Sequence, residues 1–160
     1  MTLLRTTSAQ TPSSGRDRLG NIPPWSGSRL CYFEPMIVGT GIDIAEVPRI
    51  RAALERFGDR FLRRVFTDGE IRYCQSKANH AERYAARFAA KEAAMKALGT
   101  GWNYGIRWRD IEVTRRPGSR PAVVFHGKAA EFAAKLGAKN AALSLSHTAD
   151  QAIAQVILES

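Results

Sequence analysis

The chain has 160 residues, of which 44% are hydrophobic and 24% are charged. This length and composition are typical of one globular domain with a buried core, and they exclude a chain that is disordered throughout. The formal net charge of +9 and the sequence pI near 10.2 indicate anionic partners, such as nucleic acid, phosphate-bearing cofactors or an acidic protein.

The cysteine content and the hydropathy pattern bear on location. The only cysteines are Cys31 and Cys74, and they indicate no disulfide framework. No apolar run reaches the length of a membrane span, and the N-terminus lacks the apolar region of a secretory signal. We therefore expect a cytoplasmic protein that works in a reducing environment and outside the membrane.

Residues 1–35 are rich in Ser, Thr, Pro, Gly and Arg and show no helical or strand periodicity, whereas regular patterning begins at Met36. We expect 1–35 to be a disordered extension and 36–160 to be the folded domain. Asp17 and two adjacent prolines argue against an organelle transit peptide. An upstream start codon, with Met36 as the functional start, is the simpler explanation.

The periodic part of the chain predicts the α+β class. Over 37–44, Gly39 and Gly41 alternate with larger residues, which is typical of a strand that another element approaches closely. The central helix is expected over 81–98, which is rich in Ala, lacks Gly and Pro, and is closed by Gly99. Further helices are expected near 46–57, 60–66, 68–77 and 127–137. Further strands are expected near 107–115, 121–126, 141–148 and 151–159, the last two as a hairpin that turns near Ala149–Asp150.

Glu92 interrupts the apolar stripe of the central helix, where Tyr84, Phe88 and Met95 lie at three- to four-residue spacing. Burying an unpaired carboxylate costs on the order of several kcal/mol, so Glu92 needs a cation, a proton or good hydrogen bonds. From spacing alone, an ordinary i,i+4 ion pair with Lys96 also explains this residue.

Asp43 has the same strand parity as the two glycines. The spacing D-x-x-E at 43–46 is also typical of a capping box at a helix start, although Pro48 would then remove a helix hydrogen bond beyond the first turn. An ordinary strand-end or turn aspartate is a further reading. Two carboxylates from different elements suit Mg²⁺, whereas the His and Cys residues lack the spacing of zinc ligands.

Three stretches together resemble a known family. GIDIAEVPRI (41–50), RFAAKEAAMKALGTG (87–101) and LSLSHTADQAIAQVIL (143–158) are similar to the signature regions of holo-acyl-carrier-protein synthases, the small phosphopantetheinyl transferases. The resemblance spans 36–160 and implies the phosphopantetheinyl transferase fold, in which antiparallel hairpins pack around a long central helix. It implies transfer of 4′-phosphopantetheine from coenzyme A to a serine of apo-acyl carrier protein, which yields adenosine 3′,5′-bisphosphate, in fatty acid biosynthesis.

The resemblance also implies residue roles. Asp43 and Glu92 would bind Mg²⁺ together with the coenzyme A diphosphate, and Lys96 would protonate or stabilise the leaving adenosine 3′,5′-bisphosphate. The base for the serine proton would be a carboxylate, or a metal-bound water held by Asp43 or Glu92, with His147 the weaker candidate. Gly99 is equally explained as a plain helix C-cap. The residues implied to line the coenzyme A pocket are Arg87, Lys91, Gly99, Thr100, Gly101, His147 and Thr148.

The first helical region carries Arg49, Arg56, Arg60 and Arg63, which would share one face if the helices there were continuous. A solvated basic surface explains them, and so does a dock for the acidic acyl carrier protein, which the resemblance favours. The resemblance further suggests a homotrimer with active sites between subunits, in which the Glu92 helix comes from the chain that supplies Asp43 or from its neighbour.

A nucleic-acid-binding module without catalysis is the alternative that the net charge alone would allow. Such a module would interleave aromatic stacking residues with the basic ones. The aromatic residues instead lie on apolar helix faces, and Asp43 and Glu92 would have no purpose. The sequence therefore favours an Mg²⁺-dependent transferase.

Overall fold

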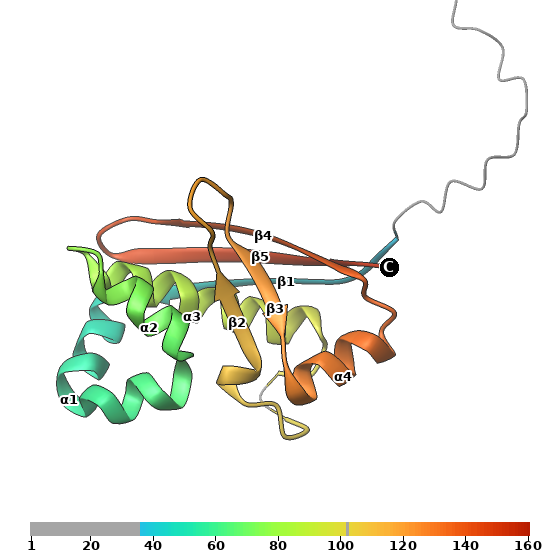
Figure 1. Ribbon diagram of the computed structural model, residues 1–160, viewed down its shortest axis with the longest axis horizontal. Helices are drawn as coiled ribbons and strands as arrows, with labels where there is room; N and C mark the ends of the chain where they lie inside the picture. Colours follow the sequence, from blue (N-terminus) through green and yellow to red (C-terminus); the bar gives the residue numbers. More distant parts are fainter. Residues whose placement is uncertain (1–35, 102) are drawn as a thin grey trace, which may run out of the picture. The chain divides into compact units, whose positions relative to one another are not determined.

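The computed structural model describes residues 36–101 and 103–160, so the predicted disordered extension at 1–35 lies outside the described residues. The predicted α+β class is confirmed (Figure 1). No helix among the described residues is both long and apolar enough to cross a membrane. The elements in chain order are β1 (Ile37–Glu46), α1 (Val47–Val65), α2 (Asp68–Gln75), α3 (His80–Ala97), the 3₁₀ turn η1 (Trp108–Asp110), β2 (Ile111–Thr114), β3 (Ala122–Phe125), α4 (Gly127–Lys135), β4 (Asn140–His147) and β5 (Gln151–Glu159).

The strands form two antiparallel sheets. The larger has the order β1-β5-β4, and β2 and β3 pair separately. The predicted C-terminal hairpin of β4 and β5 is confirmed, and β5 also pairs with β1 along its length, from Ile37 opposite Glu159 to Glu46 opposite Gln151. Figure 1 shows α3 running along the larger sheet, with α1 and α2 near one end and α4 near the other.

The close approach that the sequence predicted on the glycine face of β1 is confirmed, and the approaching element is helix α3. A Cβ atom added to Gly41 would overlap the carbonyl oxygen of Ala93, and one added to Gly39 would overlap that of Ala97. The alanine-rich face of α3 therefore approaches the backbone of β1 more closely than any side chain would allow. The neighbouring strand β5 turns its buried positions toward the same helix: Ala152, Ala154, Val156 and Leu158.

Helix α1 is interrupted at Gly58, whose φ of 48° and ψ of −130° are not helical. This conformation is open mainly to glycine, and it divides α1 into halves that match the two helices predicted at 46–57 and 60–66. The condition for one continuous arginine face is therefore not met, because Arg49 and Arg56 precede the break whereas Arg60 and Arg63 follow it.

The strand predicted over 107–115 is shorter than expected. Its first part forms η1, because the Asp110 carboxylate accepts the backbone N–H of Arg107 at 3.0 Å and the Arg107 guanidinium at 3.0 Å, which closes a tight turn. β2 begins only at Ile111. An aspartate in an otherwise β-rich run therefore stops the strand by capping a turn.

Adding a methyl group at the contact between β1 and α3 should destabilise the protein. We expect Gly41→Ala to lower the free energy of unfolding by about 1–3 kcal/mol, because the added Cβ forces the helix away from the strand. Urea unfolding at fixed protein concentration measures this. Gly69→Ala on α2 is the matched control, since its Cβ would meet side-chain atoms and no backbone, namely Glu112 Oε1 at 3.2 Å and Thr67 Oγ1 at 3.8 Å. Equal stability of the two variants would contradict the packing argument.

Candidate active site

A cleft of about 560 Å³ lies between β1, α1 and α3, and we call it the carboxylate cleft. Asp43, Glu92 and Lys96 line it, together with Arg49. Asp43 lies on the face of β1 that meets α3, and Glu92 and Lys96 are one helical turn apart on α3. The structure therefore brings the three predicted catalytic residues together within one chain.

Lys96 pairs with Asp43 and not with Glu92. Its Nζ lies 2.9 Å from Asp43 Oδ1, and it also donates to the carbonyl oxygen of Ile42 at 3.0 Å. The ordinary i,i+4 reading of Glu92 and Lys96 is therefore wrong. The capping-box reading of Asp43 is also wrong, because this residue lies inside β1 and the N-cap of α1 is Glu46.

The Glu92 carboxylate is half-buried and makes no hydrogen bond or ion pair with any residue of the described ranges. Burial raises the pKa of Glu92, and the nearby negative charge of Asp43 raises it further, whereas Lys96 acts in the opposite direction. Both of the raising effects penalise the ionised form in the absence of a cation. A cation between the two carboxylates would remove the penalty.

The donor set of the cleft fits Mg²⁺. This ion takes carboxylate oxygens, needs only one or two protein ligands, and completes its shell with water and substrate phosphate. Asp43 and Glu92 are such a pair. The described residues contain no group of three or more His, Cys, Asp or Glu side chains that could hold a metal on its own.

Lys91 was predicted to line the coenzyme A pocket, and the structure places it elsewhere. Its side chain is fully buried, with Nζ 2.9 Å from Glu70 Oε2, and it donates to the carbonyl oxygens of Trp108 and Ile111. Glu70 Oε1 in turn accepts the N–H of Val113 at 3.0 Å. Burial lowers the pKa of Lys91, and Glu70 opposes this effect. Three acceptors use the three ammonium protons, so none remains for a ligand.

Arg87, His147 and Thr148 lie outside the carboxylate cleft. His147 Nε2 lies 3.7 Å from Glu82 Oε2, and the Arg87 guanidinium stacks over the Tyr73 ring at 4.1 Å from its centroid. Glu82 precedes Glu92 by ten residues, which is about 15 Å along a helix. None of these residues lines the carboxylate cleft.

Two arginines that the sequence analysis missed accompany Arg87, namely Arg83 on α3 and Arg115 after β2. The Nε atoms of Arg83 and Arg87 are buried without a hydrogen-bond partner, and none of the three arginines has an ion pair within the described ranges. Burial acts to raise the pKa of Tyr73, but the hydrogen bond with Arg115 and the three positive charges together lower it. Such a cluster suits a phosphate. The i,i+4 spacing of Arg83 and Arg87 was a signal in the sequence, whereas the position of Arg115 was not.

Gly99, Thr100 and Gly101 close α3. Gly99 has a φ of 71°, its N–H donates to the Lys96 carbonyl at 3.0 Å, and the Thr100 N–H donates to the Met95 carbonyl at 3.2 Å. This is a Schellman cap, so the plain capping role of Gly99 is confirmed. That the segment also contacts coenzyme A stays a prediction.

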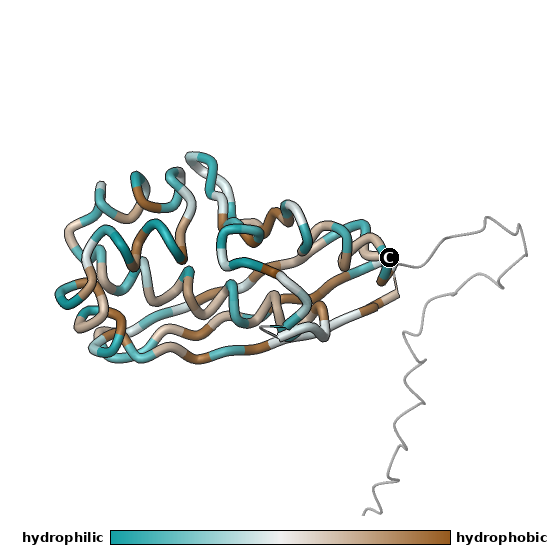
Figure 2. The backbone as a smooth tube through the Cα atoms, turned by 90° about the horizontal axis from the view of Figure 1, so that it is seen from below, coloured by the Kyte–Doolittle hydropathy of each residue, from teal (hydrophilic) through white to brown (hydrophobic). Residues whose placement is uncertain are grey.

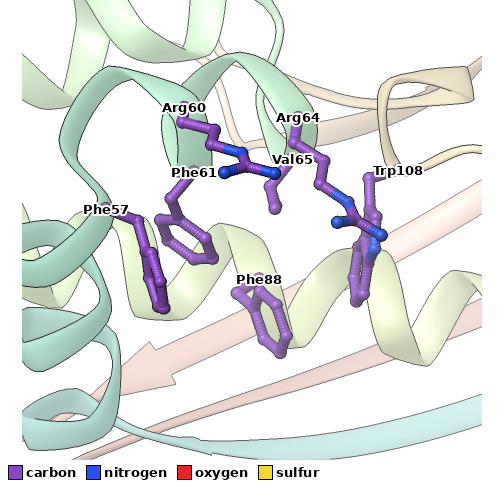
Figure 3. A pocket seen from close by; sticks show the side chains of 7 residues that line it. All are labelled: Phe57, Arg60, Phe61, Arg64, Val65, Phe88 and Trp108. Carbon is purple, nitrogen blue, oxygen red and sulfur yellow. The ribbon is translucent and has the colours of Figure 1, made fainter.

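Three of the four predicted docking arginines line hollows of the surface. Arg49 lines the carboxylate cleft, Arg60 lines a neighbouring pocket of about 470 Å³, and Arg63 lines a third hollow. The Arg56 guanidinium lies 5.0 Å from the centroid of the Phe57 ring. Figure 3 shows the second hollow, the aromatic pocket, with Arg60 and Arg64 beside its apolar lining. That lining consists of Phe57, Phe61, Val65, Phe88 and Trp108.

Comparison with known proteins agrees with the family resemblance found in the sequence. The sequence profile of the 4′-phosphopantetheinyl transferase superfamily matches residues 39–156. A holo-[acyl-carrier-protein] synthase of Koribacter versatilis is 66% identical over 124 residues, which are 78% of this chain and 99% of that protein. The crystal structure of the Neisseria meningitidis holo-[acyl-carrier-protein] synthase matches with a TM-score of 0.70 and 32% identity, over 78% of this chain and 100% of that one. The Helicobacter pylori synthase in complex with coenzyme A matches with a TM-score of 0.65 and 33% identity, over 74% and 98%.

The chain therefore belongs to the 4′-phosphopantetheinyl transferase superfamily, within its family of holo-[acyl-carrier-protein] synthases. The resemblance seen in the three sequence stretches is confirmed, and so is the fold class. The nucleic-acid-binding alternative finds no support in these comparisons.

The free-energy penalty for ionising Glu92 should be measurable in metal-free protein. Because its pKa is raised on folding, the folded protein binds more protons than the unfolded chain at pH values between the ordinary pKa of 4.5 and the folded pKa. Stability is therefore lost as the pH rises through this window, and the loss is complete above it. With a chelator present, we expect Glu92→Gln to unfold at a higher temperature than wild type at pH 8, with a difference that narrows toward pH 5. Glu55→Gln, exposed on α1, is the control. A less stable Glu92→Gln protein at pH 8 would contradict the assignment.

Proposed function

We propose that this transferase uses the carboxylate cleft to move 4′-phosphopantetheine from coenzyme A to a serine of apo-acyl carrier protein in fatty acid biosynthesis, with Asp43 and Glu92 as ligands of Mg²⁺. One observation carries the proposal: the Glu92 carboxylate is half-buried and unpartnered, and it shares a cleft with the Asp43–Lys96 ion pair. The names of the relatives and the solved complex of one relative with coenzyme A support the substrates.

The reaction joins the serine oxygen to the β-phosphorus of coenzyme A, breaks the bond from that phosphorus to the leaving adenosine 3′,5′-bisphosphate, and releases the serine proton. Bound Mg²⁺ supplies charge neutralisation on the diphosphate. Lys96, which pairs with Asp43 at 2.9 Å, would donate a proton or hydrogen bond to the leaving phosphate. The base for the serine proton would be the carboxylate of Asp43 or Glu92, or a metal-bound water that they hold.

The phosphate groups of coenzyme A need positively charged side chains, and its nucleotide needs a segment whose backbone it can approach closely. We assign Arg87, His147 and Thr148 to this role, joined by Arg83 and Arg115, because the unpartnered guanidinium nitrogens suit phosphate oxygens. Gly99–Thr100–Gly101, directly after the helix that carries Lys96, remains a further proposed contact. Lys91 is withdrawn from this set because its ammonium is used inside the core.

The proposed assembly is a homotrimer with active sites at subunit interfaces. Opposite the α3 face of the larger sheet, Ile42, Ile44 and Ile153 are 54%, 58% and 39% exposed, and Ile44 pairs directly with Ile153. Figure 2 shows hydrophobic positions recurring along these strands. An exposed apolar face of this kind suits a second copy of the chain. A neighbour could then bring its Arg87 group to the carboxylate cleft, from which the Arg87 group of the same chain is separated along α3.

The carrier protein is proposed to dock along α1, beside the carboxylate cleft. Arg49, Arg56, Arg60 and Arg63 complement the negative surface expected of an acidic carrier, which speeds encounter and fixes register. Phe57 and Phe61 come from either side of the break at Gly58, and both line the aromatic pocket beside Arg60 (Figure 3).

The domain assignment and the location rest on the sequence. We propose that 36–160 is the catalytic domain, which agrees with the profile match over 39–156, and that 1–35 is an extension to it. A cytoplasmic location is proposed, because the two cysteines indicate no disulfide framework.

Removing either carboxylate should abolish transfer. We expect Asp43→Asn and Glu92→Gln each to lower the rate by about 100-fold or more, because the metal and the charge balance at the diphosphate are lost. The assay incubates protein, coenzyme A, Mg²⁺ and apo-acyl carrier protein, and follows the gain of a phosphopantetheine arm by intact mass. Circular dichroism and thermal unfolding check the fold, and Glu55→Gln is the active control. An active Glu92→Gln enzyme would refute the metal assignment, and no mass gain with any of several carriers would refute the function.

A charge on the outer face of the sheet should separate the subunits. We expect Ile153→Lys to sediment as a monomer where wild type sediments as a trimer, and to lose transfer activity, because the lysine cannot be buried unpaired. Val124→Lys, at a hydrophobic position on β3 that is 38% exposed, should leave the assembly intact. A monomeric wild type that is fully active would contradict the shared site.

A further inference from the structure

The three hollows of the surface adjoin one another and form one track. The aromatic pocket shares Phe61 and Phe88 with the carboxylate cleft. A third hollow of about 660 Å³ shares Arg64 and Trp108 with the aromatic pocket. The track therefore leads from the proposed catalytic carboxylates, over α1 and α3, to η1 and the start of α4.

The third hollow is rich in arginine, and we call it the basic cleft. Arg63 and Arg64 line it from α1, and Arg107 and Arg109 line it from η1 and the residue before it. Only the α1 residue Arg63 was predicted to dock a partner. The turn that Asp110 closes brings Arg107 and Arg109 opposite α1, and the sequence did not predict this turn.

Arg63 and Arg109 can exchange their present ion pairs for contacts with a partner at little cost in free energy. Arg109 lies 3.2 Å from Asp68, with side chains 44% and 66% exposed, and Arg63 lies 3.8 Å from Asp59, with side chains 72% and 81% exposed. Ion pairs this exposed contribute little to stability. Arg107 is held more firmly, because its partner Asp110 is buried and caps the turn.

The order of the three hollows suits an acidic carrier protein. A carrier whose serine reaches Asp43 and Glu92 must cover the surface next to them, where the aromatic pocket accepts an apolar side chain. Beyond that pocket the surface offers guanidinium groups from two separate elements, which suit carboxylates on an acidic protein.

We propose that the basic cleft is the far end of the carrier-protein footprint, where Arg63 and Arg109 bind acidic side chains of the carrier while its serine occupies the carboxylate cleft. This inference rests on the proposed transfer to acyl carrier protein. It extends the docking surface from α1 to η1 and makes Arg109 a determinant of carrier affinity.

Charge reversal tests the proposal in the full-length enzyme. We expect Arg109→Glu to raise the KM for apo-acyl carrier protein about fivefold at low salt, with the ratio to wild type shrinking as salt is added, while the KM for coenzyme A stays at the wild-type value. Arg63→Glu should behave in the same way. Arg116→Glu is the matched control, because Arg116 is exposed in the loop between β2 and β3 and carries the same change of charge.

The outcomes separate this inference from the function on which it rests. If wild type modifies no carrier, the proposed function fails. If wild type is active but Arg109→Glu and Arg63→Glu keep its KM for carrier, the basic cleft is not part of the footprint. An equal rise in KM for Arg116→Glu would show a general effect of net charge and would overturn the proposal. So would binding of a DNA duplex that outcompetes the carrier and is lost in Arg109→Glu.

Discussion

The backbone contact between α3 and β1 is the constraint on which the rest of the structure depends. Gly39 and Gly41 leave no room for a Cβ under the carbonyl oxygens of Ala97 and Ala93, so helix and strand lie as close as two backbones can. Asp43 continues the same face of β1 and therefore meets α3 at its last turns. The carboxylate cleft is a consequence of this packing, because a larger residue at either glycine would move the helix away from Asp43.

A second constraint sets the rotation of α3 about its axis. Successive residues of a helix point about 100° apart, so Lys91 and Glu92 cannot face the same surroundings. Lys91 enters the core and is held by Glu70 and two carbonyl groups, which leaves Glu92 turned to the cleft. A buried ion pair is a weak source of stability, but breaking it by removing one partner is costly. The pair therefore favours one rotation of the helix over others that would bury the same alanines.

The sequence predicted the order of helices and strands and the shared site of Asp43, Glu92 and Lys96, because periodicity, glycine spacing and the family signatures are local properties. It did not predict features that depend on distant partners. The family resemblance implied that Lys91 lines the coenzyme A pocket, whereas its side chain is buried against Glu70 on another helix. The strand expected from residue 107 was shortened by a side-chain cap. Spacing within a helix also favoured an ion pair between Glu92 and Lys96, whereas the nearest carboxylate in space belongs to β1.

The charge distribution would give the proposed Mg²⁺ a role beyond the chemical step. Coenzyme A is anionic and the proposed carrier is acidic, and arginines line the surface from the carboxylate cleft to the basic cleft. Asp43 and Glu92 are carboxylates within this positive surface, at the place where both anionic substrates must meet. Lys96 balances one of them, and Glu92 remains without a partner. A divalent cation there would change local repulsion into attraction, so it would promote the meeting of the substrates as well as their reaction.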